Sequence, residues 1–295
     1  MILVTGATGL VGRPLVTALA ADGRAVRAVT RAPATAALPD GIEIVHGDPS
    51  RPSTLADALK GVTALFLHPR AAGEAAAELV ALARDRGVRR VVALSALNID
   101  ENPDDQPSRH RGDRNKEAEQ AVTASGLEWA SLRSGTFAAS GLHAWGAQIR
   151  AGDVVHGPYP EFSEAPIHEQ DLADVAARAL ITDRPLGRLE LTGPHALTHA
   201  RMIEVIGGVL GRPLTYRGVP PEAAAEALLR QGVAAPFVAA LLARYRRELG
   251  RPAVVTDTVQ RVLGRPAHDY ATWVADHADA FAAPPTTAGF TPPSR

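Results

Sequence analysis

Cysteine is absent from this sequence of 295 residues, which excludes disulfides, thiolate metal sites and a cysteine nucleophile. Aromatic residues are scarce, at 4%. No hydrophobic run approaches the roughly 20 residues that a membrane-spanning helix needs. The strand-like Ile2-Leu3-Val4 follows Met1 directly. We therefore expect no signal peptide and a cytoplasmic location.

A strong charge of either sign is also lacking, because the net charge is −1 with acidic and basic residues interspersed. The longest basic cluster considered, Arg89–Arg90, is too short to form a basic stripe. Nucleic acid and membrane surfaces are therefore not expected as partners. We expect a small-molecule substrate. A homodimer is compatible with the sequence, which leaves the oligomeric state open.

Hydrophobic residues make up 46% of the chain, enough for a sizeable core. In the first half, short β-branched runs alternate with helical patterns. The expected strands are Ile2–Val4, Ala25–Val29, Ile42–Val45, Val62–Leu67, Val88–Leu94 and Glu128–Leu132, and the expected helices lie near Val11–Ala21, Pro52–Leu59, Ala72–Arg86 and Asn115–Ser125. Continuous apolar strands separated by helices predict an α/β fold with a doubly wound parallel sheet, a Rossmann domain.

We expect an NAD(P)-binding Rossmann core over residues 1–133 and an interleaved, mostly helical substrate-binding part over residues 134–282, some of which completes the core. Residues 134–165 contain several glycines and are expected to be rich in loops. Further helices are expected near Glu169–Leu180, His199–Leu210 and Tyr270–Phe281, with two more in 221–248, and strands near Arg188–Leu191 and Leu214–Arg217. The Pro-, Thr- and Gly-rich tail, residues 283–295, is expected to be disordered.

A glycine-rich loop follows the first strand and opens the first helix, with the spacing G-x-x-G-x-x-G. Small residues let backbone N–H groups approach a pyrophosphate, and the helix N-terminus adds partial positive charge. A ligand-free turn is the alternative, but the position at the head of a β-α-β unit favours dinucleotide binding. The expected cofactor-binding residues of the loop are Gly6, Thr8, Gly9, Leu10, Val11 and Gly12.

Arg31 stands after the second strand, where an NAD-preferring site places an acidic residue for the ribose hydroxyls. A guanidinium can pair with a 2′-phosphate and stack on adenine. A solvated arginine is the alternative. We expect NADP(H), bound as NADPH, to be preferred.

Six stretches of the sequence match the motifs of a known family: Val4–Gly12, Gly47-Asp48, Ser125–Trp129 with Leu132-Arg133, Ile167–Ala176, Leu191–Pro194 and Gly211–Pro213. In these stretches the sequence resembles the NmrA-like group of atypical short-chain dehydrogenases/reductases, and the resemblance extends over residues 1–281. The glycine loop is shared by a wider superfamily, whereas its combination with Ile167–Ala176 and Leu191–Pro194 is more specific.

The resemblance implies roles for four more residues. It implies that Asp48 lies beside the adenine, although Asp48 could equally cap the following helix. His68, with Pro69, matches the loop along the ribose and nicotinamide side. Ser95 is implied near the substrate carbonyl, and Lys116 at the nicotinamide ribose. Ser95 could instead be an ordinary hydroxyl at the end of a strand, and Lys116 could belong to a solvated helix start.

The proton-donating tyrosine of the usual Tyr-x-x-x-Lys pair is missing, because Gly112 stands four residues before Lys116. Tyr159, His143, His156 and His110 are the candidate replacements. A histidine titrates near neutral pH and could serve, although a loop histidine is more often a surface residue.

Phe137, Trp145 and Tyr159, with His143, are expected to line the site for a flat, apolar substrate, unless these aromatics simply pack the C-terminal part. The substrate itself cannot be read from the sequence. No histidine or carboxylate pattern indicates a metal, and no Gly-x-Ser-x-Gly elbow indicates a hydrolase.

Three functions remain open. The first is an NADPH-dependent oxidoreductase acting on a quinone, an enone or a related carbonyl, whose reduced oxygen is protonated more easily than a simple alkoxide. Such chemistry can dispense with the tyrosine, and Lys116, Ser95 and Tyr159 would be its catalytic residues. The second is a catalytically silent NADP(H)-binding redox sensor or regulator. The third is a redox-neutral tailoring enzyme of secondary metabolism, such as an epimerase or a cyclase.

Overall fold

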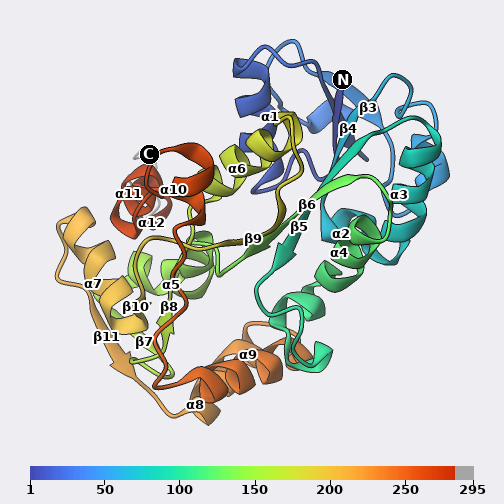
Figure 1. The fold of residues 1–295 in the computed structure, drawn as a ribbon. Helices are drawn as coiled ribbons and strands as arrows, with labels where there is room; N and C mark the ends of the chain where they lie inside the picture. Colours follow the sequence, from blue (N-terminus) through green and yellow to red (C-terminus); the bar gives the residue numbers. More distant parts are fainter. Residues whose placement is uncertain (283–295) are drawn as a thin grey trace, which may run out of the picture.

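A seven-stranded parallel sheet forms the centre of the computed structural model, which describes residues 1–282 (Figure 1). The strands are β1 (Ile2–Val4), β2 (Val26–Thr30), β3 (Glu43–His46), β4 (Ala64–Leu67), β5 (Arg90–Ala96), β6 (Glu128–Ser134) and β9 (Gly187–Leu191). They lie in the order β3-β2-β1-β4-β5-β6-β9. The order reverses between β1 and β4, where open α/β sheets bind ligands. The predicted doubly wound parallel sheet is confirmed.

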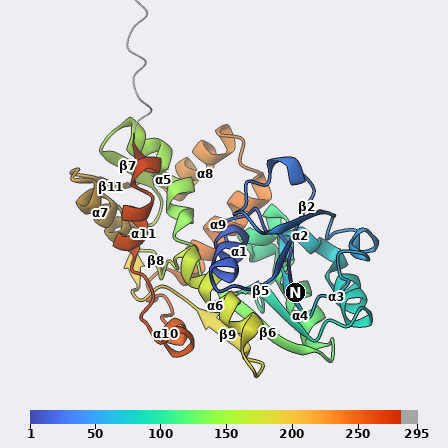
Figure 2. The ribbon, with the colours of Figure 1, turned by 90° about the horizontal axis from the view of Figure 1, so that it is seen from above.

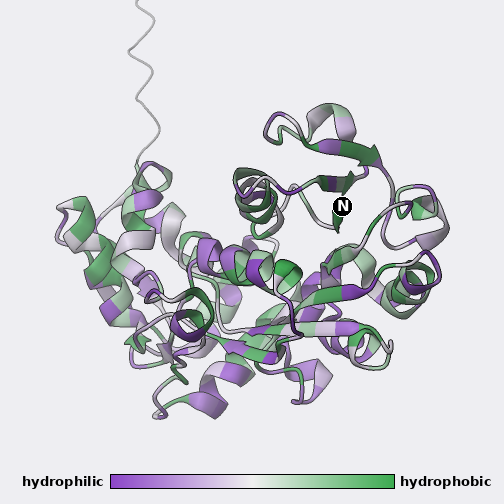
Figure 3. Ribbon diagram, turned by 45° about the horizontal axis from the view of Figure 1, so that its top comes forward, coloured by the Kyte–Doolittle hydropathy of each residue, from purple (hydrophilic) through white to green (hydrophobic). Residues whose placement is uncertain are grey.

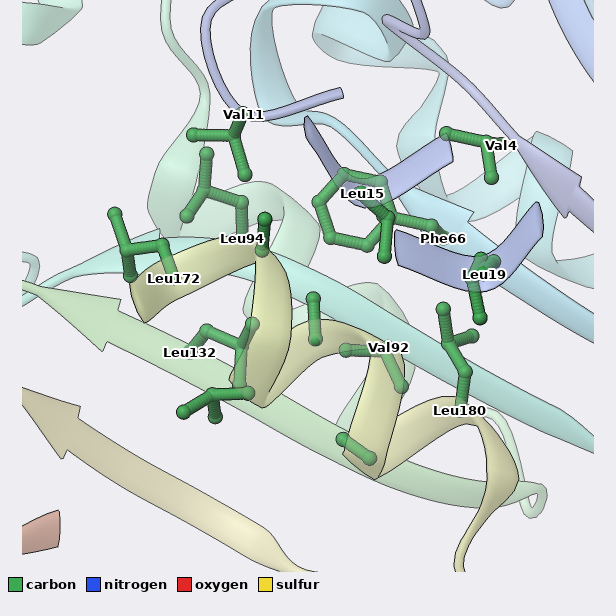
Figure 4. Close-up of a cluster of buried hydrophobic side chains, with 14 of the residues drawn as sticks. Val4, Val11, Leu15, Leu19, Phe66, Val92, Leu94, Leu132, Leu172 and Leu180 are labelled. Atoms are coloured by element: carbon green, nitrogen blue, oxygen red, sulfur yellow. The ribbon is translucent and has the colours of Figure 1, made fainter. Parts of the chain in front are cut away.

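Helices cover both faces of this sheet (Figure 2). On one face lie α1 (Gly12–Ala21) and α6 (Glu169–Ile181), and on the other α3 (Ala76–Asp85) and α4 (Asn115–Thr123). Ile2 and Val4 point into the first of these layers and Leu3 into the second, as strand alternation requires. Figure 4 shows the first layer, where leucines of α1 and α6 meet Val4, Phe66 and Val92 of the strands.

A smaller third core lies in the C-terminal part. Around it pack α5 (Ala139–Ala151), β7 (Val154–Gly157), α7 (His199–Leu210), β11 (Thr215–Gly218), α11 (Tyr270–Asp276) and α12 (Ala278–Phe281). The C-terminal part also contains β8 (Ser163–Glu164), β10 (Leu197–Thr198), α8 (Pro221–Arg230), α9 (Ala235–Glu248) and α10 (Thr258–Leu263). The mostly helical C-terminal part is thus confirmed. Two elements that follow residue 134 belong to the main sheet layer instead: β9 adds its last strand, and α6 packs on one of its faces.

The prediction that residues 134–165 are rich in loops is wrong in one respect, because the helix α5 occupies much of this stretch. Its glycines permit close packing rather than ending the helix. A Cβ on Gly141 would lie 2.5 Å from the hydroxyl of Tyr270, and one on Gly146 would lie 2.8 Å from Leu142 Cδ1. Gly141 therefore marks a contact between α5 and α11, and Gly146 leaves room for the Leu142 side chain of its own helix, neither of which the sequence reveals.

Three expected helices are also shorter or broken. The segment Pro52–Leu59 contains a 3₁₀ helix over Pro52–Leu55 followed by turns. The segment Ala72–Arg86 is interrupted after α2 (Pro69–Ala72), because Gly73 adopts φ 57° and ψ −136°. The last helix divides at His277 into α11 and α12. The expected disordered tail lies outside the described residues.

The Ile167–Ala176 segment attaches the end of the chain to the core. Asp171 is fully buried and accepts hydrogen bonds from Arg265 Nη1 at 2.7 Å and from the backbone N–H of His268 at 2.8 Å. Glu169 accepts one from Trp273 Nε1 at 2.8 Å. These contacts place α10 and α11 beside α6.

Figure 3 shows hydrophilic and hydrophobic residues side by side on the helices around the sheet. This distribution is typical of helices with one buried face. Within residues 1–282, no helix combines the length and the apolarity needed to cross a bilayer.

Candidate functional site

The loop between β1 and α1 is shaped by two close approaches. Gly6 adopts φ 65°, and a Cβ on it would lie 2.8 Å from the ring of His68. A Cβ on Gly12 would lie 2.0 Å from the carbonyl oxygen of Gly6, so helix and loop can approach only with glycine there. Gly9 differs, because a Cβ on it would meet only the Gly6 oxygen, at 3.2 Å. Gly6 and Gly12 therefore hold the turn together, while Gly9 faces outward.

The same loop presents unpaired backbone donors. The N–H groups of Leu10, Val11 and Gly12 donate to no protein acceptor within residues 1–282, while those of Gly9 and Arg13 bond to Gly6 and Gly9. Three free N–H groups at the start of α1 can donate hydrogen bonds to the oxygens of a dinucleotide pyrophosphate, and the exposed Gly9 leaves room for its approach. The residues present therefore fit the cofactor that the sequence predicts.

Arg31 and Asp48 lie at the ends of neighbouring strands. Arg31 is exposed and has no ion pair within the described residues. The carboxylate of Asp48 accepts hydrogen bonds from the hydroxyl and the N–H of Ser50, at 2.7 and 3.0 Å, and the hydroxyl bond contributes most to lowering the pKa of Asp48. Asp48 thus caps the turn before the Pro52–Leu55 helix, and its contact with adenine stays a prediction.

His68 follows β4 and caps α2. The ring Nδ1 accepts a hydrogen bond from the backbone N–H of Arg70 at 3.3 Å, and the backbone N–H of His68 donates to Thr5 Oγ1 at 2.8 Å. Burial lowers the pKa of His68, so the ring is neutral at pH 7. Because Nδ1 is the acceptor, we assign the proton to Nε2. His68 therefore offers an N–H donor beside Gly6.

Lys116 lies in the first turn of α4, half-buried and without an ion pair in the described part of the chain. Gly112 does not belong to that helix. It ends the 3₁₀ helix Pro107–Arg111 with φ 93°, in the left-handed region. The position of the missing tyrosine is thus fixed in a backbone conformation that favours glycine, and it is not one turn from Lys116 on a continuous helix.

Ser95 is buried at the end of β5 and belongs to a network centred on Glu119 of α4. Glu119 accepts hydrogen bonds from Ser95 Oγ at 3.2 Å, from Ser131 Oγ at 2.6 Å and from Arg133 Nε and Nη2 at 3.0 and 2.7 Å. Arg188 of β9 donates to it at 2.7 Å. Burial alone would raise the pKa of Glu119, but these bonds outweigh it and lower the pKa to about 2. The network joins α4 to three strands, and the predicted role of Ser95 at the substrate stays a prediction.

Of the residues expected to line the substrate site, Tyr159 is the most unusual. It is half-buried, adopts φ 50° and packs edge-on against Tyr245 of α9, with ring centroids 6.2 Å apart. A positive φ in a tyrosine is a strained conformation of the kind that clusters at functional sites. Phe137 is half-buried just after β6.

The structure separates the other candidates from this group. Trp145 is only 6% exposed and packs edge-on against His199 and Tyr216 in the third core, which matches the packing alternative. His143 is exposed on α5. His110 Nε2 lies 2.9 Å from the carbonyl oxygen of Asp104, and His156 is exposed on β7. Their roles as proton donors or substrate contacts stay predictions.

A buried ion pair near Tyr159 was missed by sequence reasoning. Glu164 of β8 is 7% exposed and lies 3.1 Å from Arg244 Nη1 of α9, and Thr136 Oγ1 donates to the same carboxylate at 2.7 Å. Glu164 raises the pKa of Arg244 against the opposing effect of burial. Burial raises the pKa of the neighbouring Tyr245, which therefore stays a phenol at pH 7. These residues come from distant segments, and no local motif signals them.

Ion pairs also fix α9 against the segment that follows β5. Arg247 Nη2 lies 2.5 Å from Glu101 Oε2, and its Nη1 lies 3.5 Å from Asp105 Oδ2. Figure 1 shows α9 beside this segment, below the carboxyl ends of β5 and β6. The carboxyl edge of the sheet is therefore bordered by the glycine loop, His68, Lys116 and the Tyr159–α9 region.

Comparisons with known proteins identify the family and the fold of this chain. The model of a family described as NAD(P)H-binding matches residues 6–183. A (4-alkanoyl-5-oxo-2,5-dihydrofuran-3-yl)methyl phosphate reductase from Streptomyces griseus is 38% identical over 285 residues, 96% of this chain and 99% of the relative. An NAD(P)H azoreductase from Xenophilus azovorans is 30% identical, with 96% of this chain and 100% of the relative covered.

Among solved structures, an NADPH-dependent quinone oxidoreductase from Escherichia coli, complexed with NADPH, superposes with a TM-score of 0.79. It covers 94% of this chain and 100% of the other, at 24% identity. At this identity the likeness shows the shared fold.

Proposed function

This chain belongs to the NAD(P)H-binding family of reductases, as its resemblance to NmrA-like proteins implies, and from that premise we propose that it uses NADPH to reduce a conjugated carbon–carbon double bond next to a carbonyl. The observation that carries the proposal is Gly112. Its left-handed backbone stands where related reductases of simple ketones carry a proton-donating tyrosine. A site without that phenol suits an acceptor whose reduced form is protonated without a strong acid nearby.

The substrate of the Streptomyces griseus relative, by its name, contains such a bond, because a 2,5-dihydrofuran-5-one carries a double bond conjugated to the lactone carbonyl. At 38% identity over nearly the full length of both chains, that name favours an unsaturated lactone or enone for this chain as well. Quinones are also conjugated carbonyl compounds that accept a hydride equivalent, but their reduction gives a hydroquinone, in which both carbonyl groups have become hydroxyl groups.

The residues of the chain would divide the work as follows. The glycine loop and the N-terminus of α1 hold the pyrophosphate, Arg31 the 2′-phosphate, and Lys116 the nicotinamide ribose. When bound, NADPH would supply a hydride. The β-carbon of the substrate would receive this hydride and the α-carbon one proton from solvent, which gives the saturated carbonyl compound and NADP⁺. His68 and Tyr159 offer an imidazole N–H and a phenol that can hydrogen-bond the carbonyl as negative charge develops.

Arg31 supports the preference for NADPH over NADH. It is exposed after β2, and no carboxylate of the described chain occupies the place where NAD-specific sites hold the ribose hydroxyls. The names of the two relatives at or above 30% identity, both reductases, favour this function over the redox sensor and the redox-neutral enzyme.

The direct test is the loss of NADPH absorbance at 340 nm with matched acceptors. We expect turnover with an α,β-unsaturated lactone, an enone and a quinone, and none with the corresponding saturated ketone. Turnover of the saturated ketone alone would contradict the proposal. Tight NADPH binding without turnover of any acceptor would contradict the proposal and support a redox sensor instead.

A further inference from the structure

Tyr159 stands in a turn whose backbone is strained. Its φ of 50° lies in the left-handed region. Pro158 and Pro160 flank it, and a proline restricts both its own backbone and that of the residue before it. Strain of this kind persists only where the surrounding structure over-determines it. The contacts of the turn therefore show what keeps Tyr159 in this conformation.

The N-terminus of α7 holds the carboxyl side of the turn. The N–H of His199 donates to the carbonyl oxygen of Phe162 at 3.0 Å, and the N–H of Ala200 donates to that of Pro160 at 3.1 Å. Within the turn, the N–H of Phe162 donates to the carbonyl oxygen of Tyr159 at 3.0 Å. His199 and Phe162 are buried, so water does not compete for their hydrogen bond. The backbone after Tyr159 is thus fixed by main-chain bonds.

The amino side of the turn is held by a side chain, that of Tyr216 on β11. Its hydroxyl donates to the carbonyl oxygen of Pro158 at 2.8 Å. This carbonyl belongs to the planar peptide group that enters Tyr159, and the rotation between that plane and the next bonds is the φ angle of Tyr159. Tyr216 therefore acts directly on the strained torsion.

The surroundings of Tyr216 support this contact. β11 pairs with β7, and a Cβ on Gly157, the last residue of β7, would lie 2.1 Å from the hydroxyl oxygen of Tyr216. Glycine at this position leaves the space that the hydroxyl occupies. Burial raises the pKa of Tyr216, which therefore stays a phenol and a hydrogen-bond donor at pH 7.

These bonds leave the phenol of Tyr159 free. Its side chain is half-buried, and its hydroxyl has no hydrogen-bond partner within residues 1–282. The ring packs edge-on against Tyr245 of α9. The preceding residue of α9, Arg244, lies 3.4 Å through its Nη2 from Thr136 Oγ1, two residues beyond β6. The free phenol therefore adjoins the carboxyl edge of the sheet, where the substrate is expected.

We propose that Tyr216 positions Tyr159 for the reduction, by fixing the peptide plane from which Tyr159 projects. The inference rests on the proposed function, in which the Tyr159 phenol hydrogen-bonds the substrate carbonyl. A donor stabilises developing charge best when it is oriented before the reaction begins, because no free energy is then lost in turning it. Tyr216 acts through Tyr159 and is a positioning residue.

The first test is a double-mutant cycle on kcat, measured from the loss of NADPH absorbance with an α,β-unsaturated lactone. Tyr159→Phe removes the donor and should lower kcat roughly 100-fold. Tyr216→Phe keeps the Tyr159 phenol but releases its backbone, so we expect a roughly 10-fold lower kcat, the effect of a misplaced group, and an unchanged KM for NADPH. The double variant should match Tyr159→Phe, because the two residues act as a unit.

Tyr270→Phe is the matched control, because it removes a buried hydroxyl of the same third core that has no partner within the described residues. It should leave kcat and KM unchanged. If the two losses multiply in the double variant, Tyr216 acts independently of Tyr159 and the proposal is overturned. An unchanged kcat in Tyr159→Phe would also overturn it, by removing Tyr159 from the reaction.

A second measurement needs no turnover. The chain has four tyrosines, so ring-labelled tyrosine gives a small set of NMR signals that the variants assign. We expect Tyr216→Phe to shift or broaden the signal of Tyr159, and Tyr270→Phe to leave it in place. An unmoved Tyr159 signal in Tyr216→Phe would overturn the positioning role while leaving the reductase proposal standing. A moved signal in a protein that reduces no conjugated acceptor would support the positioning and contradict the reductase proposal.

Discussion

Ser95 donates a 3.2 Å hydrogen bond to Glu119, a carboxylate that also receives two N–H groups of Arg133. The serine at the end of β5 therefore contacts α4 through its hydroxyl. Through this contact and those with Ser131, Arg133 and Arg188, Glu119 joins α4 to the strands β5, β6 and β9.

Glu119→Gln is expected to weaken the dependence of stability on acid pH. A carboxylate whose pKa falls to about 2 on folding stabilises the folded state above its unfolded pKa and loses that contribution as pH falls through the folded value. The contribution is of the order of 3 kcal/mol and disappears between about pH 5 and pH 2. Urea unfolding at pH 7, 5, 4 and 3 should show that the free energy of unfolding falls less with decreasing pH in Glu119→Gln than in wild type. Parallel pH profiles would contradict the assignment.

Ser95→Ala serves as the control, because it removes one bond and keeps the carboxylate. We expect about 1 kcal/mol lower stability at every pH. If the hydroxyl serves only Glu119, kcat should stay within about threefold of wild type. A loss of a hundredfold or more, about 2.7 kcal/mol, would support the predicted role of Ser95 at the substrate.

Gly9→Val and Gly12→Val should separate cofactor binding from folding. A side chain at Gly9 points away from the protein and meets only the Gly6 oxygen at 3.2 Å, so the variant should fold and lose NADPH binding. At Gly12 the new Cβ would lie 2.0 Å from that oxygen, and the variant should unfold at markedly lower denaturant concentration. Circular dichroism and NADPH fluorescence titration measure the two effects. NADPH affinity retained in Gly9→Val would refute the loop as the pyrophosphate site.

Arg31→Glu should weaken NADPH far more than NADH. Replacing a guanidinium by a carboxylate removes an attraction to the 2′-phosphate and adds a repulsion, so we expect at least tenfold weaker NADPH binding. Arg89→Glu makes the same charge change just before β5, at the amino ends of the parallel strands, whereas Arg31 follows the carboxyl end of β2. It should leave the ratio of the NADPH and NADH affinities unchanged. Equal losses for NADPH and NADH in Arg31→Glu would remove Arg31 from the phosphate role.

Gly112→Tyr should not create a ketone reductase. The left-handed φ of 93° costs a tyrosine about 1–2 kcal/mol, and the residue precedes α4 rather than lying on it. Gly112→Asn is the control, because asparagine tolerates this conformation better, and its stability should lie closer to wild type. The readouts are the free energy of unfolding and the oxidation of NADPH with a saturated ketone. Ketone turnover in Gly112→Tyr would show that the phenol can reach the substrate after all.

The Rossmann core could be predicted because its signals are local. Ile2–Val4 is an apolar strand followed at once by the glycine loop and a helix, and the same alternation recurs to Glu128–Ser134. The helix α5 was missed because Gly141 and Gly146 resemble loop residues, and their purpose depends on Tyr270 and on side-chain packing. Likewise the pairing of Glu164 with Arg244 depends on tertiary structure.

The most direct test of the central claim follows the hydrogen that the substrate receives. Wild-type protein is incubated with an α,β-unsaturated lactone and NADPH carrying deuterium at both C4 positions of the nicotinamide, and the product is examined by NMR. We predict one deuterium at the β-carbon of a saturated lactone, with the carbonyl intact. Deuterium on a carbinol carbon, or a product without deuterium, would contradict the reduction of a conjugated double bond.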